Sequence, residues 1–367
     1  MNIRIHVITW LLILFPLLAV SGNLENATPA SKPKVLLFSA VDSRYLADSL
    51  PFWGNDVGVN GFILSYIADW WSPKSEIFKN ADVLKTINTQ GRQYDIDSNF
   101  IKVALGYKEL PLWTDDQAWA EVIDNVKNIA ELIKKTGTKG IALDTEPYKV
   151  SLFDTKALRF GSANRDVLKA KVYERGRETM QALTEVFPDI EVIVLPEGAF
   201  YWFNPDAGPK PGAYELWIDY FNGMLSVKNN KGIVVAGERT YNIRDGNSLK
   251  RVSDLINASM MQHVENPVFW NEHCSVALGM WPLGKEYDNK AAKMSPLEFR
   301  RQFSQAAKLS PKYIWIYGHG SSWFQLKPSD VDKYTRGGRG IWGKDYQILP
   351  TDPDIDEYYS VLRDYKR

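Results

Sequence analysis

The chain has 367 residues, of which 45% are hydrophobic and 24% are charged, so it can bury a large core. Its formal net charge is +0 and its isoelectric point is near 6.9. A chain with no net positive charge has no overall positive potential to attract a phosphate backbone, which argues against a nucleic-acid partner. The sole cysteine is Cys274, so an intramolecular disulfide is excluded.

Residues 1–22 have the pattern of a secretory signal peptide. Arg4 supplies a positive charge, residues 7–20 are apolar, and Val20-Ser21-Gly22 offers small residues for cleavage. The apolar stretch is short for a membrane span, and an uncleaved anchor is the alternative. Residues 23–34 are polar and predict a linker. We therefore expect a secreted or periplasmic protein with no membrane span once the signal is removed.

Short apolar runs that end in turns or polar residues predict strands along the rest of the chain. The run Ile141–Leu143 is typical, because it is wholly apolar and is followed at once by carboxylates. The predicted strands are 35–40, 61–67, 100–105, the segment from Gly140 through Leu143, 190–195, 232–236, 275–278 and 313–316.

Helical spacing and capping residues predict helices between these strands. Thr114 and Gln117 have the spacing of a capping box before a long helix that Gly137 ends, and Ser295 and Glu298 repeat that spacing. The predicted helices are 43–50, 81–89, 114–136, 164–187, 213–227, 248–262, one that opens at Ser295, and 352–365.

Strands that alternate with helices indicate parallel βαβ units. We therefore predict an α/β fold, a (β/α)8 or TIM barrel, as one catalytic domain over residues 35–367. The first third is expected to be irregular, because its helices are short and interrupted by proline. No glycine-rich phosphate-binding motif follows an early strand, which weakens the case for a dinucleotide-binding fold.

Asp144 and Glu146 form the most specific motif in the sequence. They are two residues apart, so on an extended strand both side chains point to the same side. Pro147 then ends the strand. Barrel enzymes have their active sites at the carboxyl ends of their strands, which is where this pair of acids lies. Two close carboxylates cannot both ionise cheaply, so Glu146 can hold a proton and act as an acid while Asp144 stays charged. The alternatives are an ion pair with a buried Lys or Arg, or a metal site of oxygen ligands.

Other strand ends bring further polar and aromatic residues to the same edge of the predicted barrel. Glu197 and Glu238 each follow a strand beside a glycine, where the backbone can turn sharply, and are candidates for the second catalytic carboxylate. Asp42 also follows a strand, and we interpret it as a cap of the turn there. The candidate substrate-binding residues are Asp69, Trp70, Tyr107, Tyr148, Trp202, Tyr241, Trp281, His319 and Trp323.

The run Gly140-x-x-x-Asp144-x-Glu146 resembles the fourth-strand motif of barrel glycoside hydrolases, notably the chitinase-like (family 18) enzymes and, less closely, the family 25 lysozymes. The resemblance implies that Glu146 is the proton donor and that Asp144 supports a substrate acetamide that attacks in place of an enzyme nucleophile. It also implies that Trp323 forms an aromatic floor under the sugar.

The sequence departs from these families at several positions. Ala142 stands where the chitinase-like motif has a further Asp. Glu146-Pro147 is similar to the Asn-Glu-Pro of retaining barrel glycosidases, but Thr145 replaces the Asn. Those enzymes keep a Glu after the seventh strand, where this chain has Met280 and Trp281. The likeness covers fewer than ten residues and the general architecture.

The sequence thus predicts a glycoside hydrolase that acts on a poly- or oligosaccharide by carboxylate acid/base catalysis and needs no cofactor. Its carboxylates are Glu146 and Asp144 with Glu238 or Glu197, and its partner is a carbohydrate substrate. The remaining alternatives are a carbohydrate-binding barrel without catalysis and a metal-dependent hydrolase on a related barrel, although nothing in the spacing demands a metal.

Overall fold

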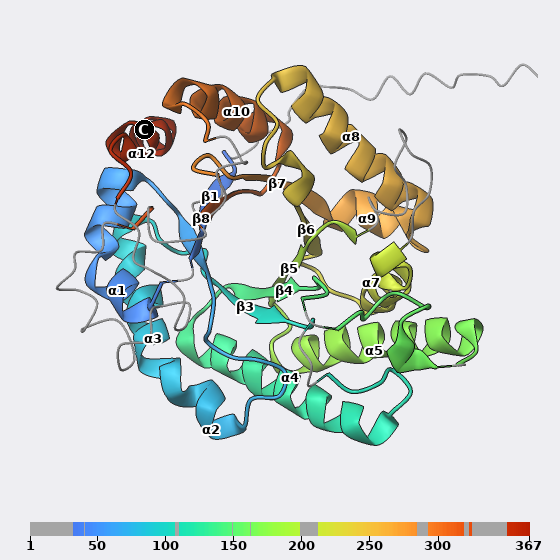
Figure 1. The fold of residues 1–367 in the computed structure, drawn as a ribbon. Helices are drawn as coiled ribbons and strands as arrows, with labels where there is room; N and C mark the ends of the chain where they lie inside the picture. Colours follow the sequence, from blue (N-terminus) through green and yellow to red (C-terminus); the bar gives the residue numbers. More distant parts are fainter. Residues whose placement is uncertain are drawn as a thin grey trace, which may run out of the picture. The chain divides into compact units, whose positions relative to one another are not determined.

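A computed structural model describes residues 32–39, 41–106, 110–148, 150–161, 163–198, 212–284, 293–318, 323–324 and 351–367. Its strands form a closed barrel in which each strand pairs in parallel with the next and β8 returns to β1 (Figure 1). The (β/α)8 prediction is confirmed. The strands are β1 (Lys34–Ser39), β2 (Gly61–Leu64), β3 (Phe100–Ala104), β4 (Gly140–Asp144), β5 (Glu191–Leu195), β6 (Ile233–Gly237), β7 (Ser275–Met280) and β8 (Tyr313–Gly318).

The strands are apolar because both of their faces are covered. One set of alternating side chains, including Leu36, Ile193 and Trp315, fills the barrel interior as a cluster of its own. The opposite set, including Val35 and Val192, packs outward against the helices in a second, larger cluster. The uninterrupted hydrophobic runs that predicted the strands follow from this double burial.

Helices surround the ring of strands (Figure 1). The Ser295–Glu298 capping box and the left-handed Gly137 at a helix end are confirmed. Thr114 was the wrong cap, because Asp115 accepts the hydrogen bond from the Ala118 N–H at 3.0 Å. The α-helices are α1 (Ser43–Asp48), α2 (Lys74–Ile77), α3 (Ala81–Gln90), α4 (Asp116–Thr136), α5 (Arg165–Val186), α7 (Trp217–Leu225), α8 (Gly246–His263), α9 (Pro267–His273), α10 (Pro296–Leu309) and α12 (Ile355–Lys366).

The first third is irregular, as expected. A π-helix, Phe52–Val57, follows α1, and short 3-10 turns, Phe78–Asn80 and Gly91–Tyr94, flank α3. Asp42 caps α1 through the Arg44 N–H at 2.9 Å. The remaining 3-10 turns are Leu158–Phe160, Gly212–Tyr214 and Glu238–Thr240.

The amino-terminal end of the barrel is closed by a polar cluster around Glu191. The buried Glu191 carboxylate pairs with Lys312 at 2.8 Å and Lys139 at 3.1 Å. It also accepts a hydrogen bond from the Tyr313 hydroxyl at 2.7 Å. These contacts give the buried charge the partners that it needs.

The last helix, α12, packs against the irregular segment that precedes β2. Arg363 donates to the Asp56 carbonyl, and Lys366 donates to the carbonyls of Gly54 and Tyr94, each at 2.9 Å. The left-handed Gly58 lies directly against the α12 backbone, where a Cβ would come within 3.0 Å of Arg363 Cα. Contacts between distant parts of the chain therefore close this side of the barrel.

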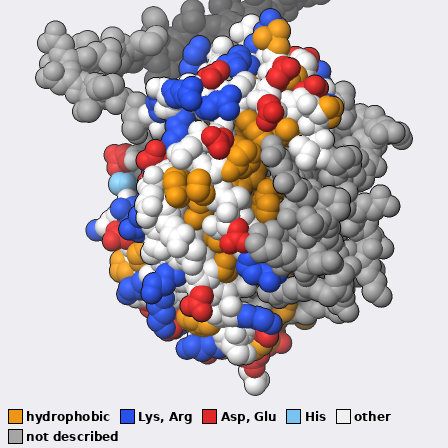
Figure 2. All heavy atoms as spheres, turned by 90° about the vertical axis from the view of Figure 1, so that its left-hand side faces the viewer, with side chains coloured by type: hydrophobic (Ala, Val, Ile, Leu, Met, Phe, Trp, Pro, Cys, Tyr) orange, Lys and Arg blue, Asp and Glu red, His pale blue; other side chains and the backbone are white. Residues whose placement is uncertain are grey.

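On the face shown in Figure 2, basic and acidic side chains are interspersed with small hydrophobic areas, in keeping with a net charge of +0. Within the described residues, no helix has the length and apolar character to cross a membrane. The predicted signal peptide and most of the predicted linker lie outside the described residues and stay predictions.

Candidate active site

Asp144 ends β4 inside the barrel and is anchored by three contacts. Its Oδ1 accepts the Glu146 N–H at 3.0 Å, and its Oδ2 accepts the Tyr148 hydroxyl at 2.6 Å. The same Oδ2 forms an ion pair of 2.7 Å with Nζ of Lys102. Asp144 is almost fully buried, so these contacts supply the donors that a dehydrated carboxylate requires.

Lys102 is the site residue that sequence reasoning missed. It pairs with Ala142 across the β3–β4 ladder, and its ammonium group lies 5.8 Å from the Phe38 ring centre and 5.3 Å from that of Tyr148. The side chain is only 14% exposed. A lysine inside the apolar strand Phe-Ile-Lys-Val-Ala was the available signal, because a charge there must have a partner. An ion pair with a buried lysine is one of the alternatives that the sequence allows for the acids of β4.

Thr145 lies between the two acids in the sequence but faces the outer layer. Its hydroxyl donates to the Leu195 carbonyl at 2.7 Å and accepts from the Trp217 indole N–H at 3.0 Å. The alternation of side chains therefore places Asp144 and Glu146 on the inner side. Gly106 leaves room for this turn, because a Cβ there would lie 1.8 Å from the Glu146 carbonyl oxygen.

Glu197 follows β5 and is fully buried. Its Oε2 accepts the Glu238 N–H at 2.7 Å, and its Oε1 accepts the Arg239 N–H at 3.0 Å. Burial raises the pKa of Glu197 to about 7, and the backbone hydrogen bonds oppose that rise. The carboxylate thus holds the start of the turn after β6, and Glu238 is the acid that this turn presents.

Glu146 and Glu238 are electrostatic neighbours although they follow different strands. Burial and then the charge of Asp144 raise the pKa of Glu146, whereas a hydrogen bond from Tyr148 and the charge of Lys102 lower it. Burial and then the charges of Glu146, Glu197 and Asp144 raise the pKa of Glu238 well above its usual value. Two neighbouring acids with raised pKa values are typical of catalytic sites.

Aromatic rings surround Tyr241, which follows Glu238 by three residues. The centre of its ring is 5.2 Å from Trp315, 5.4 Å from Tyr317 and 5.7 Å from Trp281. Phe38 joins the group 5.0 Å from Tyr317. We call these five residues the aromatic wall. It comes chiefly from β1, β7 and β8, whereas the acids follow β4, β5 and β6.

The structure brings some of the predicted binding residues together and leaves others apart. Tyr148 is 47% exposed with its hydroxyl on Asp144, and Tyr241 and Trp281 belong to the aromatic wall. Asp69 lies in a turn where its N–H donates to the Ser72 hydroxyl at 3.1 Å. Tyr107, Trp202 and His319 lie outside the described residues.

Trp323 and Trp70 are core residues, which corrects their expected roles. Trp323 packs between α10 and α12, with ring centres 6.3 Å from Phe299 and 6.2 Å from Tyr358. Trp70 is buried in the outer hydrophobic cluster, and its carbonyl accepts from Asn125 at 2.7 Å. Both rings lie in the layer between strands and helices. Trp323 therefore does not form the aromatic surface under the sugar that the resemblance implied.

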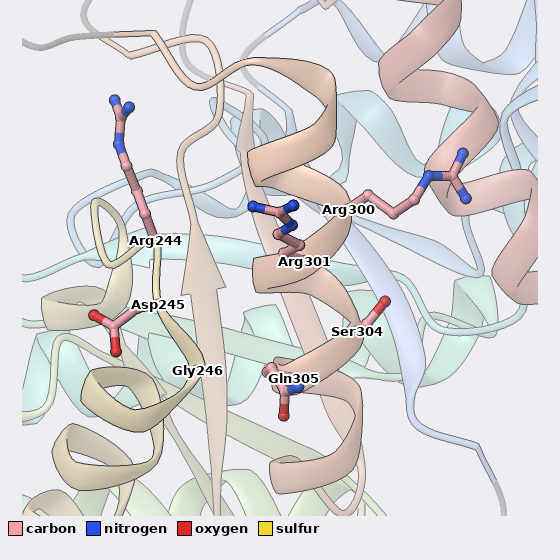
Figure 3. Close-up of a pocket in the computed structure, with 7 residues that line it drawn as sticks. All are labelled: Arg244, Asp245, Gly246, Arg300, Arg301, Ser304 and Gln305. Carbon is pink, nitrogen blue, oxygen red and sulfur yellow. The ribbon is translucent and has the colours of Figure 1, made fainter.

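A separate hollow of about 410 Å³ lies between the start of α8 and the outer face of α10 (Figure 3). Arginines line it, but Arg300 points away toward α12, where it pairs with Asp364 at 2.9 Å. Arg244 pairs with Glu298 at 2.8 Å. Acids therefore neutralise two of the three arginines that line the hollow, and Arg301 is the third. Across the described part of the chain, no group of three or more His, Cys, Asp or Glu side chains has the geometry to hold a metal ion.

No protein-family model and no curated protein sequence matches this chain. Solved structures similar to it include a D-allulose 3-epimerase from Methylomonas sp., with 10% identity, a TM-score of 0.46, and coverage of 91% of this chain and 98% of that chain. A GH18 chitinase from Pseudoalteromonas aurantia has 12% identity and a TM-score of 0.43 over 77% of this chain and 92% of that chain.

Endo-glycoceramidase II from Rhodococcus sp. is similar at 10% identity and a TM-score of 0.47, over 89% of this chain and 79% of that chain. Because these identities are low and these TM-scores are below 0.5, the similarities carry no argument about activity. The barrel itself is established by the strand pairing.

Proposed function

We propose that this protein is a glycoside hydrolase in which Glu146 and Glu238 are the reacting carboxylates. The observation that carries the proposal is that two acids with raised pKa values follow the carboxyl ends of β4 and β6, and that the charge of Glu146 contributes to the raised pKa of Glu238. Glycosidic bonds are cleaved by such a pair, one group protonating the leaving oxygen and the other acting as base or nucleophile. The partly exposed members of the aromatic wall, Tyr241, Trp281 and Tyr317, provide ring faces on which a sugar can stack.

Glu197 is a positioning residue in this proposal. Both of its oxygens are engaged by backbone N–H groups, at 2.7 and 3.0 Å. A carboxylate held in this way is poorly placed to attack or protonate a substrate. It orients the turn that carries Glu238 instead.

Asp144 is also anchored rather than free. Donors from Glu146, Tyr148 and Lys102 occupy its oxygens. The family resemblance implied that Asp144 supports an attacking acetamide of the substrate. We propose instead that Asp144 orients Tyr148 and the Glu146 backbone, and that the enzyme supplies its second carboxylate from β6.

The contacts divide the roles within the pair. The Tyr148 hydrogen bond favours the ionised form of Glu146, and Lys102 favours the ionised form of both acids. Burial and the charges of Glu146, Glu197 and Asp144 outweigh that effect at Glu238 and raise its pKa well above its usual value. The shared proton therefore rests on Glu238, which becomes the acid, and Glu146 becomes the base or nucleophile. This reverses the role that the sequence motif suggested for Glu146.

The first experiment measures reducing ends released from a panel of poly- and oligosaccharides. Glu146→Gln and Glu238→Gln should each lower turnover by about 10²–10⁴-fold. Glu191→Gln is the matched control, because it makes the same change in a buried glutamate at the opposite end of the barrel. Binding to the panel without release would favour a carbohydrate-binding barrel, and loss of activity in chelator would favour a metal-dependent hydrolase.

The second experiment assigns the roles with aryl glycosides of increasing leaving-group acidity. A good leaving group needs no protonation, so the loss in Glu238→Gln should shrink as the leaving group improves. The loss in Glu146→Gln should stay large for every substrate. The opposite pattern would return the acid role to Glu146, and full activity of both variants would end the assignment.

A further inference from the structure

Lys102 carries a charge in a place where charges are rarely found. It projects from the middle of β3, and its side chain is 14% exposed. The ammonium group is 2.7 Å from Asp144 Oδ2 and lies near the faces of the Phe38 and Tyr148 rings. Its partner Asp144 is the residue whose other oxygen holds the Glu146 N–H. Lys102 is therefore linked to the backbone of Glu146, the proposed base, through a single residue, Asp144.

The surroundings of this lysine are dominated by acids. Burial of several carboxylates without a cation would leave them protonated and unable to act as bases. The titratable groups that face Lys102 or the acid pair come from β4, β5, β6 and β8 and the turns after them. They are Asp144, Glu146, Tyr148, Glu197, Glu238, Arg239, Tyr241 and Tyr317.

We propose that Lys102 is a positioning residue that keeps Glu146 ionised while Glu238 holds the proton of the pair. The ammonium group acts through its contact with Asp144, whose negative charge it compensates next to Glu146. Without Lys102, the uncompensated Asp144 would face Glu146 at close range, and Glu146 would take up a proton. The inference rests on the proposed function, because it takes Glu146 and Glu238 as the reacting pair.

The test measures protonation directly and does not require a known substrate. The carboxyl carbons of glutamate are labelled with carbon-13, and their NMR signals are followed from acid to alkaline pH. Spectra of Glu146→Gln and Glu238→Gln assign the two signals. In the wild-type protein, Glu146 should lose its proton at a lower pH than Glu238. In Lys102→Met, the titration of Glu146 should move upward by at least about one pH unit.

Activity provides a second readout once a substrate is known. Both limbs of the pH profile of kcat/KM should move to higher pH in Lys102→Met, because both carboxyls lose their proton later. Lys102→Arg keeps the charge and should keep a profile close to that of the wild type. Failure of the proposed function would appear as absence of turnover in the wild-type protein, whereas the NMR titration would still decide the role of Lys102.

The matched control is Lys312→Met. It removes an ion pair of 2.8 Å from another buried carboxylate, Glu191, at the far end of the barrel. It should leave the Glu146 titration unchanged. Lys102→Gln serves if Lys102→Met does not fold, because it removes the charge and keeps a donor for Asp144. An unchanged Glu146 titration in either folded variant, or failure of both to fold while Lys102→Arg folds, would make Lys102 purely structural and overturn the proposal.

Discussion

The carboxylate of Glu197 holds the backbone of Glu238 through a hydrogen bond of 2.7 Å from the Glu238 N–H to Oε2. Its other oxygen holds the next N–H, that of Arg239, at 3.0 Å. A fully buried carboxylate just after β5 thus sets the direction in which the turn after β6 presents its acid. This contact joins neighbouring strands at the point where the proposed chemistry takes place.

Glu197→Gln should lower activity. A glutamine can accept only one of the two N–H groups, so the turn that carries Glu238 loses one of its two anchors. The displaced Glu238 should lower kcat/KM by about tenfold or more. Because Glu197 acts through Glu238, adding Glu197→Gln to Glu238→Gln should cost little further activity, which a double-mutant cycle measures. Independent, multiplicative losses would contradict this reading.

Trp281→Ala should weaken substrate binding more than it slows turnover. The ring lies 4.9 Å from Tyr317 and 5.7 Å from Tyr241 and is only partly buried, so a sugar can reach it. We expect KM to rise about tenfold and kcat to change less, whereas Trp281→Phe keeps most of the affinity. Trp323→Phe is the control: it alters a ring buried between α10 and α12 and should lower the melting temperature without changing KM.

Glu191→Gln should destabilise the protein at neutral pH and much less in acid. Burial raises the pKa of Glu191, but its contacts with Lys312, Tyr313 and Lys139 outweigh burial and bring the pKa below its usual value. A lowered pKa stabilises the fold above the range where an unfolded glutamate titrates, and this stabilisation is lost as the pH falls. Urea unfolding should show a deficit on the order of 1–2 kcal/mol at pH 7 that shrinks toward pH 3. A deficit independent of pH would contradict the ion-pair account.

Asp219→Asn should stabilise the protein at neutral pH. Burial raises the pKa of Asp219 to about 6, and its Oδ2 has no hydrogen-bond partner within the described residues. A raised pKa means that stability present below about pH 4 is lost as the pH rises through 6. After allowance for partial exposure, the gain in Asp219→Asn should be on the order of 1 kcal/mol at pH 7.5 and close to zero at pH 4. Thermal unfolding at these two pH values checks the sign.

The barrel could be predicted because its strands are buried on both faces. Runs such as Ile141–Leu143 are wholly apolar, which makes them recognisable as buried strands, and the turns after them contain Gly or Pro. The Asp144–Glu146 motif followed from the same alternation. Thr114 failed as a cap because Asp115 stands beside it, and sequence spacing cannot decide between adjacent capping residues.

The contacts within the site could not be predicted from spacing alone. The position of Lys102 inside an apolar strand indicates a charge that needs a partner, but only the closed barrel identifies that partner as Asp144. Trp323 follows the last strand, as a substrate-binding ring would, but α12 covers it and the Tyr359 hydroxyl donates to its carbonyl. The surroundings of Lys102 and Trp323 depend on which distant segment of the chain packs against them, and the local sequence pattern does not contain that information.

The contact of α12 with the segment before β2 has a consequence for biosynthesis. Arg363 and Lys366 dock on Asp56 and Gly54, which leave the ribosome hundreds of residues earlier. β1 likewise cannot form its pairing with β8 until β8 has been synthesised. The nascent chain therefore exposes an unpaired edge of β1 until then, and that edge needs shielding from neighbouring polypeptides during this time.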